Sequence, residues 1–237
     1  MLSLHRASSD ASAHPSAGRR RGSRAHYWYC PQGFVGNEKG SLLKLQQEVL
    51  LGAQKNHIPF VRYDHIFSTA SELMDTSIQT LDAYPRCTRI LNCFRGQKEL
   101  FAHFHEKTRY NIRLSQKRGV QVSRIDVSNC DENIKREVYS VFQQTGKRHE
   151  MRTYPQHHFD ILWHMPLARW YAAYRENCII AAQVVVLLGD TATYLHGGSL
   201  YEYRSDMASY ALQWKALQDA CEEGFQYYDL WGIAPPN

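Results

Sequence analysis

The sequence has no long hydrophobic run. Its longest mainly apolar stretch, Ile179 to Leu188, has the length of a strand, whereas a membrane-spanning helix needs roughly 20 apolar residues. No apolar core of a secretory signal precedes the rest of the chain. We therefore expect a soluble globular protein. Its 237 residues, 43% of them hydrophobic, are enough for one large core or two small domains.

Clustered cysteines are also absent. The six cysteines are scattered and form no C-x-x-C pair, so the spacing of zinc ligands and a dense disulfide framework are both missing. This pattern is typical of buried or incidental thiols in a reducing compartment. It predicts a cytoplasmic protein without a metal site.

Little net charge remains outside the first 26 residues, although the formal charge of the chain is +5. Residues 1–26 carry five arginines and one aspartate, a net of +4. The positive charge is therefore mainly a property of this tail and does not by itself indicate a nucleic-acid partner. The tail lacks apolar periodicity, and we expect it to be disordered. A transit peptide is less favoured, because no amphipathic stretch follows the arginines.

Periodicity and turn residues predict an alternation of helices and strands after the tail. In the first part, Ser41 is expected to cap a helix, and one helix is expected to carry Leu100, Phe104, Thr108 and Ile112 and to end at Gly119. The expected strands of this part are 27–30, 57–64, 88–92 and 120–123.

The second part follows a recognisable order. A helix over 132–145 that ends at Gly146 precedes a three-stranded meander, and a helix capped by Asp206 and ended by Gly224 precedes a final strand. Meander, helix and strand in this order are typical of acyltransferase folds of the GNAT kind, although other α+β domains share it. The expected strands are 169–174, 178–188, 191–196 and 225–231.

A basic stripe follows one helix. Arg109, Arg113 and Lys117 are spaced by four residues, and no acidic residue occurs from Lys107 through Ile125. Such a row repels itself unless an anion lies beside it, and arginine forks suit phosphate. A phosphate-binding helix and a solvated basic face are both open interpretations.

The segment Gln116 to Gln121 nearly matches the loop that cradles the pyrophosphate of coenzyme A. However, Gln121 replaces the last glycine, and the segment follows a helix instead of preceding one. We therefore do not expect coenzyme A as a donor. No Ser-His-Asp or Cys-His nucleophile pattern is evident.

Two strand ends carry candidate site residues. Tyr194 and His196, two residues apart, are expected on one face of a strand that continues into Gly197 and Gly198, where substrate or neighbouring chain can approach closely. Asp229 lies within an apolar strand, so its carboxylate must be paired or hydrogen-bonded. Orientation of an amine and anchoring of a loop are both open, and the anchor is favoured.

Together these segments resemble the FemABX family of aminoacyl-tRNA-dependent peptidoglycan bridge-forming transferases. The resemblance runs from about Tyr27 to Asn237 and keeps the order of the motifs. The matching segments are Lys107 to Val120 (K-T-R-Y-N-I-R-x-A-x-K-x-G-V, with Ser115 at the usual alanine), Thr145 with Arg148 (T-x-x-R), Tyr194 to Ser199 (Y-L-Y-G-x-S), Arg204 to Ala208 followed by Leu212 and Trp214, and Tyr228 to Pro235 (Y-D-x-W-G-I-x-P).

The resemblance implies an α+β fold of two GNAT-like halves, the first incomplete. It implies domains at 27–124 and 125–237. It also implies transfer of an amino acid from aminoacyl-tRNA, without coenzyme A or another cofactor, to the stem-peptide amine of a nucleotide- or lipid-linked peptidoglycan precursor. This implies a cytoplasmic enzyme that can contact the inner face of the membrane peripherally. These are functions in cell-wall biogenesis and cell shape.

The implied site has three groups of residues. Asp229 and Tyr194 are expected to be catalytic, and Arg148, His196 and Arg204 to bind substrate. The basic stripe is expected to meet phosphate of the tRNA or the precursor; it comprises Lys107, Arg109, Arg113 and Lys117.

The sequence departs from the family pattern in ways that affect activity. His196 replaces a tyrosine that is usual in the family. Part of the first domain and a closing segment with a Phe-Lys pair are expected to be missing, so we expect marginal stability and low or no activity. A non-catalytic tRNA-binding module, an ordinary GNAT acetyltransferase and an inactive fragment remain the alternatives.

Overall fold

The computed structural model describes residues 5–8, 26–30, 39–63, 78 and 87–233. The chain divides into two compact units, Met1–Tyr84 and Pro85–Asn237. The expected boundary at 124/125 differs from this division, because the strand and helices between Cys87 and Ile125 belong to the larger unit. In the described part, none of the helices has the length and hydrophobicity needed to cross a bilayer.

The smaller unit contains a three-stranded sheet in the order β1-β2-β3. Strand β1 (His5–Ser8) is antiparallel to β2 (His26–Cys30), and β3 (Val61–Tyr63) is parallel to β2 after the crossover helix α1 (Lys39–Lys55). Buried Cys30 and Val49 form the centre of its small core.

Three sequence predictions differ from what the structure shows in this unit. Ser41 lies within α1, which begins at Lys39, so it is not the helix cap. The tail expected to be disordered lies mostly outside the described residues, but His5–Ser8 within it form β1. The predicted strand over 57–64 is shorter, because His57 has a positive φ and only Val61–Tyr63 pair.

The larger unit is built on a six-stranded sheet in the order β4-β9-β8-β7-β6-β5. The predicted meander is confirmed, and it is extended at one edge by β5 and at the other by β9 and β4. Only β8 and β9 are parallel among these neighbours. The strands are β4 (Cys87–Asn92), β5 (Gln121–Ile125), β6 (Ala168–Arg175), β7 (Cys178–Leu188), β8 (Thr191–Ser199) and β9 (Tyr227–Ile233).

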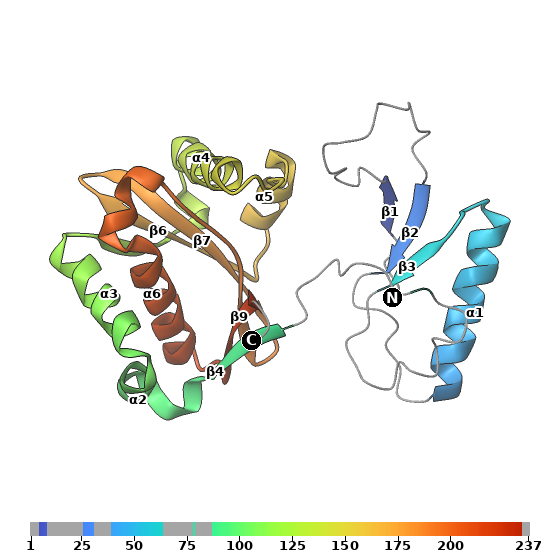
Figure 1. Ribbon diagram of the computed structural model, residues 1–237, viewed down its shortest axis with the longest axis horizontal. Helices are drawn as coiled ribbons and strands as arrows, with labels where there is room; N and C mark the ends of the chain where they lie inside the picture. Colours follow the sequence, from blue (N-terminus) through green and yellow to red (C-terminus); the bar gives the residue numbers. More distant parts are fainter. Residues whose placement is uncertain (1–4, 9–25, 31–38, 64–77, 79–86, 234–237) are drawn as a thin grey trace. The chain divides into compact units, whose positions relative to one another are not determined.

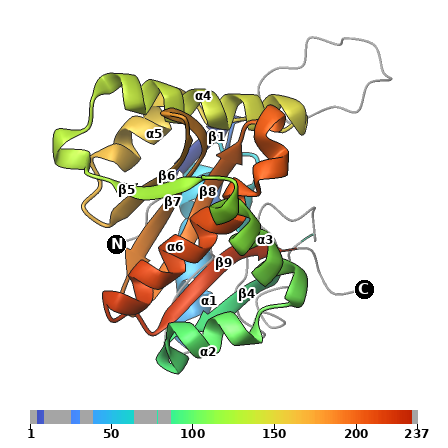
Figure 2. The same cartoon turned by 90° about the vertical axis from the view of Figure 1, so that its left-hand side faces the viewer.

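Helices cover both faces of this sheet (Figures 1 and 2). One face carries α3 (Glu106–Lys117) and α6 (Ala208–Glu222), and the other carries α4 (Glu132–Arg148) and α5 (Gln156–Trp163). Successive residues of β7 point to opposite faces: Val185 packs in the core on the α6 side, and Val184 packs in the core on the α4 and α5 side.

The single helix predicted to carry Leu100 and Ile112 is two helices, α2 (Gly96–His103) and α3. Phe104 is extended with ψ 148°, and the His105 ring accepts a hydrogen bond from the backbone N–H of Lys107. His105 therefore caps a second helix, which periodicity alone does not reveal. Gly119, at φ +77°, ends α3 as predicted.

Three other helix predictions need correction. Helix α4 passes through Gly146 and ends at Arg148, and α5 was not predicted. Helix α6 begins after Met207, which is left-handed with φ +54°, so Asp206 is not its N-cap. Asp206 instead pairs with Arg118.

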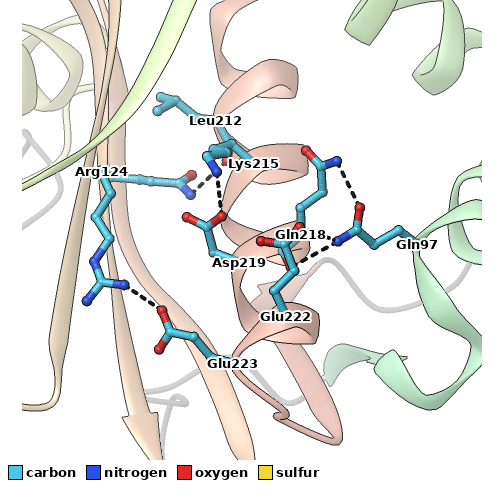
Figure 3. A network of polar contacts seen from close by, with 9 residues as sticks. Gln97, Arg124, Leu212, Lys215, Gln218, Asp219, Glu222 and Glu223 are labelled. Atoms are coloured by element: carbon cyan, nitrogen blue, oxygen red, sulfur yellow. Dashed lines mark hydrogen bonds and ion pairs between the residues drawn. The ribbon is translucent and has the colours of Figure 1, made fainter.

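Polar contacts tie α6 to the sheet and to α2 (Figure 3). Buried Gln183 on β7 donates to the main-chain oxygen of Leu212 at 3.1 Å. On the same helix, Lys215 donates to the buried carboxylate of Asp219 at 2.6 Å. A satisfied buried amide such as Gln183 fixes the register of the helix on the sheet, because any slip would leave it unpaired.

The outer surface of α6 carries further contacts (Figure 3). Gln97 on α2 donates to Glu222 at 2.8 Å and accepts from Gln218 at 3.1 Å. Arg124 on β5 pairs with Glu223 at 2.5 Å. These residues connect α6 to α2, which follows the edge strand β4, and to β5, the strand at the opposite edge.

Candidate active site

The parallel strands β8 and β9 separate part-way along their length. Their pairing covers Thr191–Thr193 on β8 and Tyr227–Asp229 on β9, while β8 continues to Ser199 and β9 to Ile233. Backbone N–H and C=O groups along a separating edge need partners from outside the pair. The point of separation is therefore a place where an extended ligand can be held by main-chain hydrogen bonds.

A β-bulge in β8 lies just beyond this point. Val184 pairs with His196 and Val185 pairs with Tyr194, so Leu195 is the extra residue. An inserted residue reverses the alternation of side chains beyond it. Tyr194 packs in the core on the α6 side, whereas His196 contacts aromatic rings on the α5 side. The prediction that Tyr194 and His196 share a face is therefore wrong.

Tyr194 belongs to a buried polar network beneath α6. Its side chain is hydrogen-bonded with Gln213, whose Oε1 accepts from the Tyr228 hydroxyl at 2.9 Å. Tyr228 is hydrogen-bonded in turn with Gln183. Burial raises the pKa of Tyr194, and the hydrogen bond with Gln213 offsets only part of this effect. Tyr194 therefore keeps its proton at neutral pH and is a hydrogen-bond donor.

His196 lies in an aromatic cluster on the opposite face. Its Nε2 is 3.0 Å from Nε2 of His158 on α5, and its ring centroid is 5.0 Å from that of Tyr154 and 5.6 Å from that of Phe159. Burial, followed by the proximity of His158, lowers the pKa of His196 to about 4. Burial also lowers the pKa of His158. Both rings are therefore neutral at pH 7.

Asp229 anchors the end of β9. Its Oδ1 accepts from the backbone N–H of Trp231 at 2.8 Å and from the hydroxyl of Thr88 on β4. Trp231 has φ +58°, an uncommon conformation for a bulky residue that these bonds stabilise. Since Tyr228 and Leu230 pack in the core on the α6 side, Asp229 faces the side of His196. The two residues expected to be catalytic, Tyr194 and Asp229, are thus on opposite faces.

Arg148 and Arg204 converge on Tyr201 in the 3-10 turn after β8 (Tyr201–Asp206). The guanidinium carbon of Arg204 is 4.2 Å from the ring centroid of Tyr201, and that of Arg148 is 5.8 Å from it. Arg148 also donates to the main-chain oxygen of Ser199 at 2.8 Å. Gln144, Arg148, Tyr201 and Glu202 line a shallow hollow of about 380 Å³. The structure therefore brings two of the expected substrate-binding residues together.

The basic stripe is divided between two roles. Arg109 donates to the main-chain oxygens of Ala102 and Phe104 at 2.9 and 2.5 Å, where it satisfies carbonyls at the end of α2. Arg113 lies over the Phe101 ring at 5.2 Å. Lys107, Arg113 and Lys117 are exposed on α3. Arg109 is thus a structural residue, and the other three are available to a polyanion.

Neighbouring chain, not open space, lies beside the two glycines of β8. A Cβ at Gly197 would come within 2.1 Å of the Tyr194 hydroxyl, and a Cβ at Gly198 would come within 2.8 Å of Thr145 Oγ1. The sequence left two explanations for these glycines, close approach of a substrate and close approach of neighbouring chain. The structure favours the second.

Sequence reasoning missed His158, Tyr154 and Tyr201. The pair Tyr154-Pro155 marks the start of α5, because proline is tolerated at a helix start. Tyr201 comes just after the segment Tyr194 to Ser199, and no sequence pattern marks it as a site residue. In the part of the chain described, no group of three or more His, Cys, Asp or Glu residues could hold a metal ion.

Residues 167–236 match the sequence profile of the FemAB family. This matched stretch is called the FemAB segment below. It contains the strands that separate and all of α6. No curated protein matches the sequence significantly.

Solved structures extend the likeness beyond the FemAB segment. FemX matches with a TM-score of 0.65 at 15% identity, over 100% of this chain and 81% of FemX. L-PGS from Bacillus licheniformis matches with a TM-score of 0.61 at 12% identity, over 88% of this chain and 63% of that one. The C-terminal domain of a lysylphosphatidylglycerol synthetase from Agrobacterium fabrum matches with a TM-score of 0.61 at 15% identity, over 88% and 65%. The chain thus spans under two thirds of the last two proteins, and the predicted GNAT-like α+β fold is confirmed.

Proposed function

We propose that this protein is an aminoacyltransferase that takes an amino acid from aminoacyl-tRNA and joins it to the stem-peptide amine of a peptidoglycan precursor in the cytoplasm. The observation that carries the proposal is the position of the FemAB segment. Residues 167–236 include the separation of β8 from β9 together with Tyr194, His196 and Asp229. The likeness to FemX supports the same function.

The proposed chemistry is aminolysis of an ester. The amine attacks the ester carbonyl, the carbonyl oxygen becomes an oxyanion, and the ribose oxygen of the tRNA leaves. Tyr194 keeps its proton and is suited to donate a hydrogen bond to the oxyanion from the α6 side of the gap between β8 and β9, while the amine approaches from the side of His196. The donor substrate carries the activated acyl group, so the reaction needs neither coenzyme A nor another cofactor.

The nucleic-acid donor needs a surface that meets phosphate. Lys107, Arg113 and Lys117 on α3 supply exposed positive charge for it. Arg148 and Arg204 beside the hollow of Gln144 and Tyr201 are suited to hold a carboxylate or phosphate of the precursor, because arginine forks bind both groups.

A different acceptor is the second candidate. One of the structures with a similar fold is named for lysylphosphatidylglycerol synthesis, and a lipid hydroxyl in place of an amine would give an ester product at the membrane surface. A non-catalytic tRNA-binding module and a fragment without activity are the remaining alternatives.

The test uses a mixture of radiolabelled aminoacyl-tRNAs with three acceptors in parallel. These are the nucleotide-linked precursor, the lipid-linked precursor in vesicles, and vesicles of phosphatidylglycerol. We expect label on one of the two precursors and a large loss of it in Tyr194→Phe, which keeps the ring and removes the donor. Cys178→Ser, at an exposed position, is the matched control and should transfer normally.

The outcomes separate the candidates. Label on phosphatidylglycerol alone would replace the peptidoglycan proposal by lipid aminoacylation. Salt-sensitive tRNA binding without transfer to any acceptor would show that the protein is a non-catalytic tRNA-binding module. Absence of both binding and transfer would identify an inactive fragment.

A further inference from the structure

His158 and His196 form a direct contact between α5 and β8. Their Nε2 atoms are 3.0 Å apart, and they come from residues far apart in the chain. In neutral imidazole one ring nitrogen carries a proton and the other accepts. A contact between two Nε2 atoms therefore needs one donor and one acceptor, and the tautomer of either ring determines that of the other.

The surroundings keep this pair uncharged. The Tyr154 ring stacks on His158 with centroids 4.3 Å apart and planes at 19°, and Phe159 lies against both rings. From β7, Val184 pairs opposite His196. The titratable groups nearest the pair are Tyr154 and His157, and His157 further lowers the pKa of His158.

The other two candidates for proton acceptor are held in structural hydrogen bonds. Tyr194 holds its own proton and lies on the other face of the sheet. Asp229 Oδ1 is occupied by the N–H of Trp231 and the hydroxyl of Thr88. His196 is only partly buried, shares the face of Asp229, and is unprotonated at neutral pH.

We propose that His196 accepts the proton of the attacking amine and that His158 is a positioning residue that sets the tautomer of His196. This inference rests on the proposed function. It requires His196 to donate from Nε2 to His158 Nε2, which leaves His196 Nδ1 free to accept. His158 then carries its own proton on Nδ1.

The step balances as follows. The amine nitrogen bonds to the ester carbonyl carbon, and one N–H proton passes to Nδ1 of His196. The proton on Nε2 of His196 can shift across the 3.0 Å contact to Nε2 of His158. When the C–O bond to the ribose breaks, the leaving oxygen takes one proton back, and both rings are neutral again.

Kinetics of two variants test the positioning role. His158→Phe keeps an aromatic ring against Tyr154 but removes the hydrogen bond, whereas His158→Gln keeps a polar group at the reach of Nε2. We expect His158→Phe to lower kcat at least about tenfold with little change in KM, since positioned acid–base groups supply roughly 10²–10⁴-fold. His158→Gln should recover part of that loss. Equal kcat in wild type and His158→Phe would overturn the proposal.

Nitrogen-15 NMR of the imidazole rings gives a readout that needs no substrate. We expect the Nε2–H tautomer for His196 in the wild type, and a changed tautomer population with a higher pKa in His158→Phe. A wild-type His196 protonated on Nδ1 would overturn the positioning role even if transfer occurs. If no acceptor is aminoacylated by the wild type, the proposed function fails, and with it the role of His196 as proton acceptor, while the NMR result still decides whether His158 positions His196.

Discussion

The hydroxyl of Thr145 on α4 is bonded to both main-chain groups of Ser199 at the end of β8. It accepts from the N–H of Ser199 at 2.9 Å and lies 3.2 Å from the oxygen of the same residue. It also reaches the oxygen of Val141 at 2.8 Å. One side chain therefore fixes the strand end that Arg148 contacts and that leads into the turn at Tyr201.

Replacement of Thr145 by valine should destabilise the protein by about 1–3 kcal/mol, because the N–H of Ser199 loses its partner. Thr145→Ser keeps the hydroxyl and should cost clearly less. Chemical denaturation measures both. A Thr145→Ser variant less stable than Thr145→Val would mean that the methyl group of Thr145, not its hydroxyl, stabilises the strand end.

Gly197→Ala should destabilise the protein by about 1–3 kcal/mol, because its Cβ would overlap the Tyr194 hydroxyl and ring. The cost should become much smaller when Tyr194 is already alanine. A double-mutant cycle measures this coupling. Additive effects of the two substitutions would show that Tyr194 is not the group that excludes a side chain at Gly197.

Folding stability should fall as the pH falls from 6.5 towards 4. The pKa of His196 is lowered from 6.5 to about 4 in the folded chain, so between these values the unfolded chain binds a proton that the folded chain does not. Linkage then makes the folded state less stable by about 1–3 kcal/mol at pH 4 than above pH 6.5. His196→Phe should flatten the profile measured by denaturation. An unchanged profile in this variant would assign the effect to other groups.

Arg109→Ala should lower the free energy of unfolding by about 1–2 kcal/mol, because two carbonyls at the end of α2 lose their donor. Lys117→Ala, on the exposed side of the same helix, should change stability by less than about 0.5 kcal/mol. Denaturation measures both variants. Loss of function in Arg109→Ala is therefore not evidence of a phosphate contact.

The same pair of variants separates folding from binding. If α3 meets tRNA, Lys117→Ala should reduce the slope of the logarithm of the binding constant against the logarithm of the salt concentration. The reduction should correspond to the loss of about one phosphate contact. A titration of binding against salt concentration measures this slope. A slope identical to that of the wild type would remove Lys117 from the tRNA-binding surface.

Local signals predicted much of the larger unit. Gly119 and Gly224 take positive φ values where helices end, and short turns join the strands of the meander. These features depend on a few neighbouring residues, so the sequence reveals them directly. The α+β class and the order of meander, helix and strand follow from the same signals.

Features that depend on distant contacts could not be predicted. The bulge at Leu195 places Tyr194 and His196 on opposite faces, and the two residues that flank it, a tyrosine and a histidine, do not mark it. The break at Phe104 interrupts a continuous helical periodicity. The contact of His158 with His196 requires α5 to lie on the sheet, which is a property of the whole unit.

The position of β9 between β8 and β4 has a consequence for biosynthesis. Thr88 on β4 and Asp229 on β9 are separated by 141 residues, so β4 leaves the ribosome long before β9, its neighbour among the strands that the structure describes. At about 5–20 residues per second, it waits of the order of ten seconds or more with both edges unpaired. Such an edge can pair with other chains. Slow synthesis of this protein should therefore favour aggregation of the nascent chain over correct closure of the sheet.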